Sequence, residues 1–283
     1  MISFKDVDIS YGKNIVIRGM SFNVDEGEVY GIIGPNGSGK TTLLRAMLGI
    51  INADRGQILI NGLDPIKTKP KIASVFETSL GTELLRLTPK EDLKFYAALY
   101  DVDITNERIH EILKLVDLHP DGRLYTFSRG MWQKLYIARA LIPDFPLIVL
   151  DEPWLGLDVT MQRKTVEIFR DLRKTIVLAA HEMPLVERVC SRILIINNGK
   201  KVVEGTVDEL LNRIEWRYEV KVSGKANEVD GVKPKKRDNL NVYYVKDLKK
   251  FLEKLDVSKL DKIDVTPISL EEAYLYLLNE KVT

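Results

Sequence analysis

Cysteine is nearly absent from the sequence, and long apolar runs are absent altogether. One cysteine, Cys190, stands among 283 residues, which excludes a disulfide within the chain and favours a reducing compartment. The first residues, Met-Ile-Ser-Phe-Lys-Asp, lack the apolar centre of a signal peptide. Nowhere does an apolar run approach the roughly 20 residues that span a bilayer. We therefore expect a cytoplasmic chain that reaches a membrane only through a partner.

Net charge is also small. The 42 Lys and Arg against 41 Asp and Glu leave a formal charge of +1, so no nucleic-acid partner is expected. The hydrophobic fraction of 45% and the charged fraction of 29% are ordinary for a globular protein. A length of 283 residues suffices for one large domain and one smaller domain.

What the sequence does contain is a glycine-rich segment, Gly-Pro-Asn-Gly-Ser-Gly-Lys-Thr-Thr, at residues 34–42. An apolar run precedes it and a helical pattern follows, which is the strand–loop–helix context of a phosphate-binding P-loop. The backbone N–H groups of such a loop bind anionic phosphates. We predict that Lys40 reaches the β- and γ-phosphates and that the Thr41 hydroxyl binds Mg²⁺. The nucleotide-binding residues predicted here are Asn36, Gly37, Ser38, Gly39, Lys40, Thr41 and Thr42.

Two acids end an apolar strand at residues 147–152, Leu-Ile-Val-Leu-Asp-Glu. Asp151 is predicted to hold Mg²⁺, directly or through water, and Glu152 to polarise the attacking water as the general base. His181 follows another buried strand at residues 175–180. A lone histidine there would be structural. Together with the P-loop and the acid pair, it is predicted to hydrogen-bond the γ-phosphate and the attacking water.

The hydrophobic periods predict an α/β sheet domain over residues 1–214 with antiparallel N-terminal strands. Short apolar runs flanked by helical patterns predict buried parallel strands after residue 146. Helical spacing after the N-cap Thr88 predicts a mainly helical insert at about residues 78–145. A capping box at Thr206 predicts the helix that closes this domain.

From residue 215 the pattern is strand, strand, helix, strand, helix, which predicts a small α+β domain over residues 215–283. The basic run at residues 233–237 is interpreted as a solvated loop rather than a site for an anionic surface, because acids are interspersed around it. A dimer contact, a regulatory role, or neither, stays open for this domain.

The order of elements over residues 1–214 resembles the ATP-binding subunits of ATP-binding cassette (ABC) transporters, and the resemblance implies a P-loop NTPase fold that binds ATP and Mg²⁺. Tyr11 stands where that family stacks an aromatic ring on adenine. Residues 127–134, Phe-Ser-Arg-Gly-Met-Trp-Gln-Lys, match the family signature LSGGQ loosely and keep Ser128 and Gly130. These residues imply binding of the γ-phosphate held by a second subunit. Residues 153–158 match the family's D-loop, in which Asp158 couples the paired sites.

One position departs from the family pattern. Where the family places Gln after the strand at residues 72–76, this chain has Glu77. Its carboxylate still offers oxygen to Mg²⁺ but adds negative charge near Glu152, so it either takes a proton or stays off the metal until the site closes. We expect hydrolysis that is active but slower. Glu77, the signature variant and the phrase at residues 268–274 resemble an exporter branch for drugs, polysaccharides or sodium, which favours export over import.

The resemblance implies two partners: a transmembrane permease subunit, and a second copy of the chain or a homologous ATP-binding subunit. The chain would then lie at the cytoplasmic face of the membrane through the permease. The competing interpretation is a soluble ABC-type ATPase acting on nucleic acid or ribosomes. Such proteins usually carry two cassettes or a long coiled-coil insertion, and this sequence has neither. A P-loop GTPase would need an Asn-Lys-x-Asp segment, which the sequence lacks.

Overall fold

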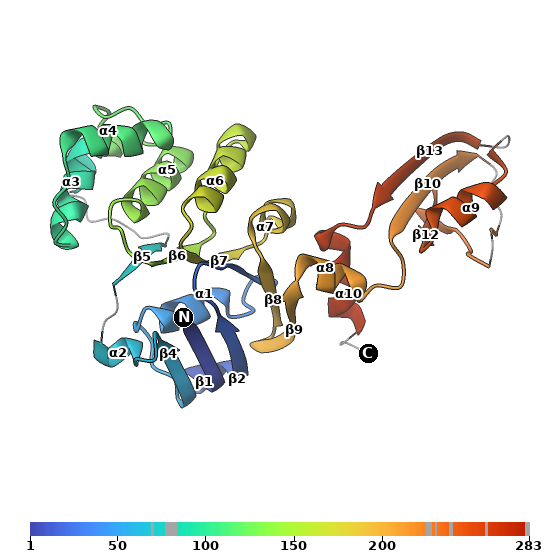
Figure 1. Ribbon diagram of the computed structural model, residues 1–283, viewed down its shortest axis with the longest axis horizontal. Helices are drawn as coiled ribbons and strands as arrows, with labels where there is room; N and C mark the ends of the chain where they lie inside the picture. Colours follow the sequence, from blue (N-terminus) through green and yellow to red (C-terminus); the bar gives the residue numbers. More distant parts are fainter. Residues whose placement is uncertain are drawn as a thin grey trace. The chain divides into compact units, whose positions relative to one another are not determined.

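The computed structural model divides the chain into two compact units, Met1–Glu204 and Gly205–Thr283 (Figure 1). Among the described residues, no helix is both long enough and apolar enough to cross a membrane. The structure describes residues 1–68, 71–76, 84–224, 228–229, 231–237, 240–257 and 260–280.

The chain begins with an antiparallel sheet in the order β2-β1-β4, with β1 Ile2–Tyr11, β2 Asn14–Val24 and β4 Arg55–Ile60. Alternate side chains such as Ile2 and Phe4 are buried on one face, as expected for strands with one solvated face. The short helix α2 (Pro65–Thr68) follows β4. The predicted antiparallel N-terminal strands are confirmed.

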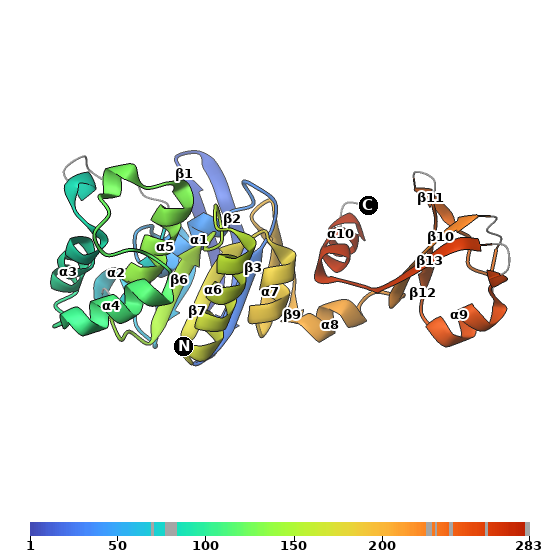
Figure 2. The ribbon, with the colours of Figure 1, turned by 90° about the horizontal axis from the view of Figure 1, so that it is seen from above.

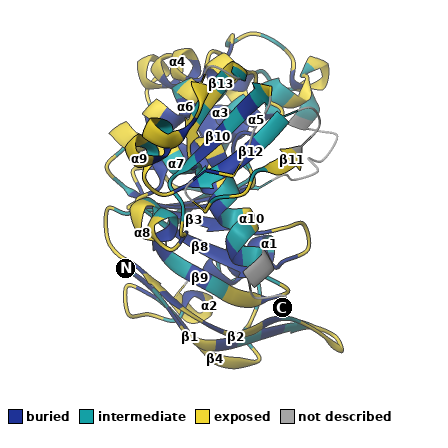
Figure 3. Ribbon diagram, turned by 90° about the vertical axis from the view of Figure 1, so that its right-hand side faces the viewer, coloured by how far each residue is buried: buried dark blue, intermediate teal, exposed yellow. Residues whose placement is uncertain are grey.

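The central sheet of the described chain has the order β5-β6-β7-β3-β8-β9. Its strands are β3 Val29–Ile33, β5 Ile72–Val75, β6 Leu147–Asp151, β7 Thr175–Ala180, β8 Arg192–Asn197 and β9 Lys200–Thr206. Strands β5, β6, β7, β3 and β8 are parallel, and β9 returns beside β8 through the turn at Asn198 and Gly199, whose φ angles are 47° and 74°. Every residue of β7 is buried, as a strand covered on both faces requires, and β3 and β8 are also dark blue in Figure 3.

Helix α1 (Lys40–Met47) lies between the two sheets. Its Leu43 and Leu44 share one apolar core with Ile32 of β3 and with the inward face of the N-terminal sheet. On the other face of β3, a Cβ built at Gly31 would lie 3.3 Å from Val186 of α7 (Met183–Val189). Helix α6 (Val159–Asp171) lies beside α7 (Figure 2). The P-loop is thereby held between a rigid strand and a buried helix.

The predicted helical insert is confirmed as a group of helices apart from the N-terminal sheet (Figure 1). The predicted capping box forms at Thr88, whose hydroxyl accepts the Glu91 N–H while the Glu91 side chain accepts the Thr88 N–H. Inside the group, the buried Arg139 guanidinium donates two hydrogen bonds to the Asp92 carboxylate, at 2.7 and 2.8 Å. This bidentate ion pair joins α3 to α5. The elements are η1 Leu84–Arg86, α3 Pro89–Leu99, α4 Asn106–Leu115, η2 Leu124–Thr126 and α5 Arg129–Ala140.

The second unit is an α+β domain, as predicted, with an antiparallel sheet in the order β11-β12-β10-β13 and α9 packed on one face. A capping box starts its last helix, in which the Ser269 hydroxyl accepts the Glu272 N–H at 3.4 Å and the Glu272 side chain accepts the Ser269 N–H at 2.8 Å. The elements are α8 Val207–Asn212, β10 Tyr218–Gly224, β11 Lys235–Arg237, β12 Leu240–Val245, α9 Leu248–Lys254, β13 Leu260–Pro267 and α10 Leu270–Glu280.

Two features of this unit differ from the sequence-based expectation. The basic run was expected to be a loop, but Lys235–Arg237 pair with β12 as an edge strand, where charged side chains are well tolerated. Helix α8 was expected to close the first domain, yet the second unit begins at Gly205. The reason is apolar packing, because Leu211 of α8 and Ile214 just after it pack against Ile268 and Ala273.

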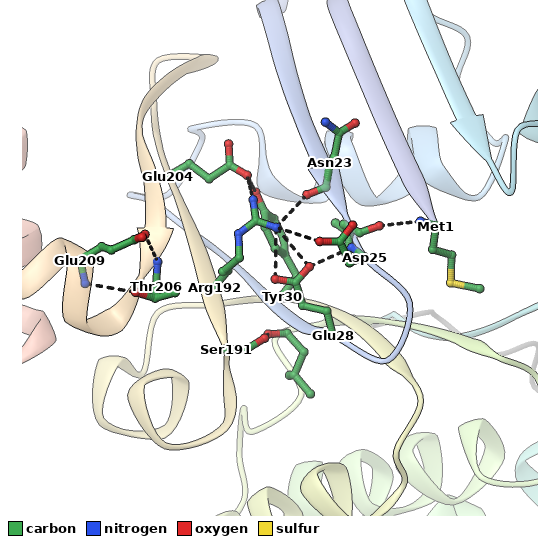
Figure 4. A network of polar contacts seen from close by, with 12 residues as sticks. Met1, Asn23, Asp25, Glu28, Tyr30, Ser191, Arg192, Glu204, Thr206 and Glu209 are labelled. Carbon is green, nitrogen blue, oxygen red and sulfur yellow. Dashed lines mark hydrogen bonds and ion pairs between the residues drawn. The ribbon is translucent and has the colours of Figure 1, made fainter.

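A polar network lies at the amino ends of β3 and β8 (Figure 4). Glu204 accepts hydrogen bonds from the Tyr30 hydroxyl at 2.8 Å, from Arg192 at 2.6 Å and from Lys201 at 3.0 Å. Arg192 also donates to both oxygens of Glu28 at 3.3 Å. Burial, and then the negative charge of Glu204, raise the pKa of Tyr30 above its usual range. The network joins β3, β8 and β9 at the edge opposite the P-loop.

Candidate nucleotide site

The P-loop connects the carboxyl end of β3 to α1. Gly37 and Gly39 have φ angles of 77° and 106°, which a residue with a side chain adopts only with strain. A Cβ at Gly34 would lie 2.3 Å from the carbonyl oxygen of Ile196, so the loop can pass β8 only as glycine. The Ser38 hydroxyl is buried and has no hydrogen-bond partner among the described residues. A glycine cradle with an unpaired buried hydroxyl suits a polar ligand such as phosphate.

Lys40 begins α1 and is 6% exposed. Its ammonium group donates to the carbonyl oxygens of Gly34 at 2.9 Å and Pro35 at 3.5 Å. It also lies 3.9 Å from Oε1 of Glu152. The structure therefore brings the predicted phosphate lysine next to the predicted general base.

Thr41 and Asp151 meet where α1 faces the end of β6. The Thr41 hydroxyl donates to Oδ2 of Asp151 at 2.8 Å. One hydroxyl and one carboxylate at the edge of a phosphate cradle are hard oxygen ligands of the kind Mg²⁺ binds, so these residues fit that metal. The third predicted metal ligand, Glu77, lies outside the described residues.

Glu152 directly follows β6 in a strained conformation, with φ at 47°. Its N–H donates to the Ala179 carbonyl at 2.8 Å, and its own carbonyl accepts from Gln133 Nε2 at 3.1 Å, so its backbone is held from two sides. Burial raises the pKa of the Glu152 carboxyl group. The charges of His181 and Lys40 and the His181 hydrogen bond offset part of that rise. A carboxyl group with a raised pKa accepts a proton more readily, which is the property of a general base.

His181 follows β7, and its ring nitrogen Nδ1 lies 2.7 Å from Oε2 of Glu152. The side chain is 53% exposed, so the ring faces solvent while it contacts the carboxylate. The structure thus gathers Lys40, Thr41, Asp151, Glu152 and His181 at the carboxyl edge of the parallel sheet, as the sequence predicts.

Ser128 and Gly130 lie at the start of α5, against the D-loop of the same chain. Ser128 is the N-cap and accepts the Met131 N–H at 3.3 Å. A Cβ at Gly130 would lie 2.6 Å from the carbonyl oxygen of Gly156. Asp158 caps α6 by accepting the Met161 N–H at 2.9 Å. Ser128 and Gly130 thus lie at a helix N-terminus, a place that attracts anions in general, and their predicted role toward another chain stays a prediction.

Tyr11 ends β1 and is 46% exposed. The following strand, β2, touches the P-loop, since a Cβ at Gly39 would lie 2.5 Å from Cδ1 of Ile17. The hairpin that carries Tyr11 therefore borders the phosphate cradle. Stacking of its ring on adenine stays a prediction.

Sequence reasoning missed three residues that shape the site. Gly199 donates its N–H to the Ser38 carbonyl at 3.1 Å and thus ties the P-loop to the turn after β8. Gln133 holds the backbone of Glu152, and Glu182 places Oε1 3.6 Å from Nε2 of His181. The sequence shows the turn signal at Gly199 and the position of Glu182 next to His181. It does not show their contacts, because these depend on the tertiary structure.

A groove of about 270 Å³ lies between the end of α1, the end of β5 and the helices α3 and α5. Its wall includes four aromatic and two cationic side chains, among them Phe76, the residue before Glu77 in the sequence. The lining residues are Arg45, Leu48, Ile50, Ser74, Val75, Phe76, Tyr96, Tyr100, Tyr136 and Arg139.

Comparison with known proteins agrees with this geometry. The ABC transporter family matches residues 17–155. The ABC transporter ATP-binding protein NatA of Bacillus subtilis is 35% identical over 207 residues, covering 69% of this chain and 83% of that protein. The linearmycin resistance ATP-binding protein LnrL of Bacillus subtilis is 30% identical over 99% of this chain and 92% of that protein.

Among solved structures, the dimeric structure of MJ0796, a bacterial ABC transporter cassette, is 26% identical with a TM-score of 0.64. It matches 73% of this chain and 98% of that chain. The sequence identities to NatA and LnrL extend over most of each relative, and they therefore establish the family. The chain belongs to the ATP-binding subunits of ABC transporters and is an ABC transporter ATPase.

Proposed function

We propose that this chain powers an exporter by ATP-driven closure of two ATP-binding subunits. The observation that carries the proposal is the constellation of Lys40, Thr41, Asp151, Glu152 and His181 at one sheet edge. Direction of transport is supported by similarity to the Nod factor export ATP-binding protein I of Paraburkholderia xenovorans, 35% identical over 74% of this chain and 72% of that protein. NatA and LnrL belong to the same set of relatives.

Phosphate binding falls to the P-loop and Lys40. The N–H groups around Gly37 and Gly39 would hold the β- and γ-phosphates, and the Lys40 ammonium would offset their negative charge. The Ser38 hydroxyl, which has no hydrogen-bond partner among the described residues, would gain one from the phosphates. Thr41 and Asp151 would hold Mg²⁺, with Glu77 as the further predicted ligand. The ion would neutralise charge on the β- and γ-phosphate oxygens.

Glu152 would remove a proton from the attacking water. The water oxygen bonds to the γ-phosphorus, the bond from that phosphorus to the bridging oxygen of ADP breaks, and the water proton moves to the Glu152 carboxylate. His181 would hydrogen-bond the γ-phosphate and keep the Glu152 carboxylate aligned through the 2.7 Å contact. The strained, doubly held backbone of Glu152 fixes this geometry.

The signature segment would act on the other subunit. Ser128 and Arg129 are exposed at the start of α5, where backbone N–H groups and the helix dipole attract anions. In a two-fold dimer, this helix start would close over the γ-phosphate held by the partner's P-loop. The ATP would then lie between the two subunits, and hydrolysis would release them.

The permease would dock at the groove beside α3, which places the chain at the cytoplasmic face of the membrane. Tyr96 and Tyr100 line the groove, and Phe95 and Leu99 of the same helix are 41% and 63% exposed. Exposed apolar side chains next to an aromatic groove suit an amphipathic helix of a partner. Phe76, which precedes the predicted metal ligand Glu77 in the sequence, lines the groove, so docking there would act next to that segment of the chain.

Concentration dependence tests the shared site. We expect ATPase activity per chain to rise with protein concentration. Ser128→Ala should lower that activity at every concentration. Lys40→Ala should weaken ATP binding measured by calorimetry. A mixture of Ser128→Ala and Lys40→Ala chains forms some sites with both residues intact, so it should regain activity that neither variant has alone. Activity that is independent of concentration and of Ser128 would contradict the shared-site mechanism.

A further inference from the structure

The sheet of the second unit ends in two edge strands, β11 and β13. Strand β11 consists of Lys235, Lys236 and Arg237, so a second copy laid along it would always oppose like charges, which protects an edge against pairing. Strand β13 has 8 residues, most of them exposed, and its charges are of both signs. Of the two edges of this sheet in the described chain, β13 alone can therefore meet a copy of itself with opposite charges facing each other.

The register of β13 on β10 decides which of its backbone groups face outward. The Ile268 N–H donates to the Arg217 carbonyl at 2.9 Å, and the same register holds along β13 as far as Lys262. Hydrogen-bonding direction alternates along an antiparallel strand, so the even-numbered residues of β13 face β10. The N–H and C=O groups of Ile263 and Val265 consequently point away from β10, toward the open edge.

The charges of β13 distinguish between the possible registers of two antiparallel copies. Centring on Ile263 places Lys262 of each copy opposite Asp264 of the other, in the non-hydrogen-bonded positions where side chains lie closest. Centring on Lys262 or on Asp264 opposes like charges instead. Centring on Val265 leaves both charges unmatched and sets Ile263 against Pro267, which has no N–H to donate. Of these registers, the charges select the one centred on Ile263.

Two further features of β13 suit that register. Asp264 lies opposite Lys221 of β10, but Lys221 already contacts Glu219 at 2.6 Å, so the carboxylate shares its lysine and can accept another. Ile263 and Val265 pack, partly buried, against the core that includes α9. A two-fold axis perpendicular to the sheet sets the two copies of Ile263 side by side on that same face, so apolar contact continues from one copy to the other.

We propose that two copies of this chain join edge to edge through β13, in the register centred on Ile263. The contact lies in the second unit and needs no nucleotide, so it does not depend on the ATP-driven closure proposed above. The register of β13 on β10 shifts between Lys262 and Leu260, and this bulge keeps the paired segment short. A short pair of strands makes a small interface, so we expect association in the high-micromolar range. It raises the effective concentration of the two ATP-binding units toward each other.

Sedimentation equilibrium of the full chain, without ATP or Mg²⁺, tests the pairing. We expect a monomer–dimer equilibrium whose Kd rises about tenfold in Lys262→Glu and in Asp264→Lys, because each variant opposes like charges twice. An equal mixture of these two variants forms opposite-charge pairs at both positions, so it should associate as tightly as the parent. Lys236→Glu changes an exposed lysine on the other edge of the same sheet and should leave Kd unchanged.

Several outcomes of this experiment would overturn the proposal. A chain that stays monomeric at millimolar concentration would do so, whether β13 then pairs with a strand of another protein or with none. An equal Kd for Lys262→Glu and Lys236→Glu, or a mixture that fails to associate, would do so as well. Ser128→Ala should associate like the parent, since nucleotide is absent. Loss of association in that variant would place the contact between the ATP-binding units and refute the role of β13, whereas failure of the Ser128→Ala and Lys40→Ala mixture to regain ATPase activity would leave the β13 contact standing.

Amide hydrogen exchange, followed by NMR at low and high protein concentration, reads the register directly. The N–H groups of Ile263 and Val265 should exchange more slowly in proportion to the fraction of dimer, because they gain acceptors only on pairing. Those of Lys262 and Asp264 already face β10 and should show no such dependence. Exchange at Ile263 and Val265 that is independent of concentration would overturn the proposal.

Discussion

Two clusters of carboxylates lie at opposite ends of the same parallel sheet, and they differ in how well their charges are matched. At the amino end, Glu28 and Glu204 share Arg192, with Lys201 and Tyr30 completing the network. At the carboxyl end, burial outweighs the nearby cations and raises the pKa of Glu152, and a Glu182 oxygen is buried without a partner in the described structure. We infer that the matched cluster serves stability and the poorly matched one serves chemistry.

The largest effect should come from the carboxyl end. Glu152→Gln keeps the shape of the side chain but cannot accept the water proton, so we expect turnover to fall by about 10²–10⁴-fold. ATP binding should persist, because Lys40 and the P-loop are intact. Phosphate release and calorimetric ATP binding measure the two effects separately. Parental turnover in this variant would show that another group is the base.

Next in size is the loss of a charge from the amino end. Arg192→Met leaves Glu28 and Glu204, whose side chains are 8% and 14% exposed, without their shared cation. We expect a loss of about 3 kcal/mol in the free energy of unfolding, measured by urea denaturation. The kcat of the folded protein should be unchanged.

A matched control is Arg55→Met, which breaks the ion pair with Asp6. Those side chains are 69% and 58% exposed, and such surface pairs contribute less than about 1 kcal/mol. If the two variants lose equal stability, the amino-end network is no more than a set of surface contacts.

The two clusters also differ in how far sequence alone predicts them. Lys40, Asp151 and Glu152 belong to motifs in which a few adjacent residues carry the signal, so their gathering at one edge was predictable. The amino-end network joins residues 164 and 174 positions apart, and each of its members looks like an ordinary charged or aromatic strand residue. Tertiary packing also decided that α8 belongs to the second unit, because Leu211 and Ile214 bury themselves there.

A smaller effect, a gain rather than a loss in the free energy of unfolding, should appear in the pH dependence of stability measured without nucleotide or metal. Burial raises the folded-state pKa of Glu152 above the ordinary 4.5, so ionisation of this group opposes folding. Below pH 4.5 the group is protonated in both states, and the cost grows as pH rises until the folded carboxyl group ionises. Glu152→Gln should therefore gain stability relative to the parent as pH increases from 4 to 8 in urea denaturation. A difference that shrinks with rising pH would contradict this.

The smallest effect concerns one hydrogen bond of the amino-end network. Tyr30→Phe removes the donor 2.8 Å from Glu204, but Arg192 and Lys201 still pair with that carboxylate, so the loss should be about 1 kcal/mol. Cys190 gives a local probe, because it is the single cysteine, is buried, and has a pKa raised by that burial. Its labelling by a thiol reagent requires opening, so Tyr30→Phe should label about fivefold faster than the parent. Tyr125→Phe, at a ring 66% exposed, should label at the parental rate. Equal labelling rates for the two variants would mean that the Tyr30 hydroxyl adds nothing to the local stability of this end of the sheet.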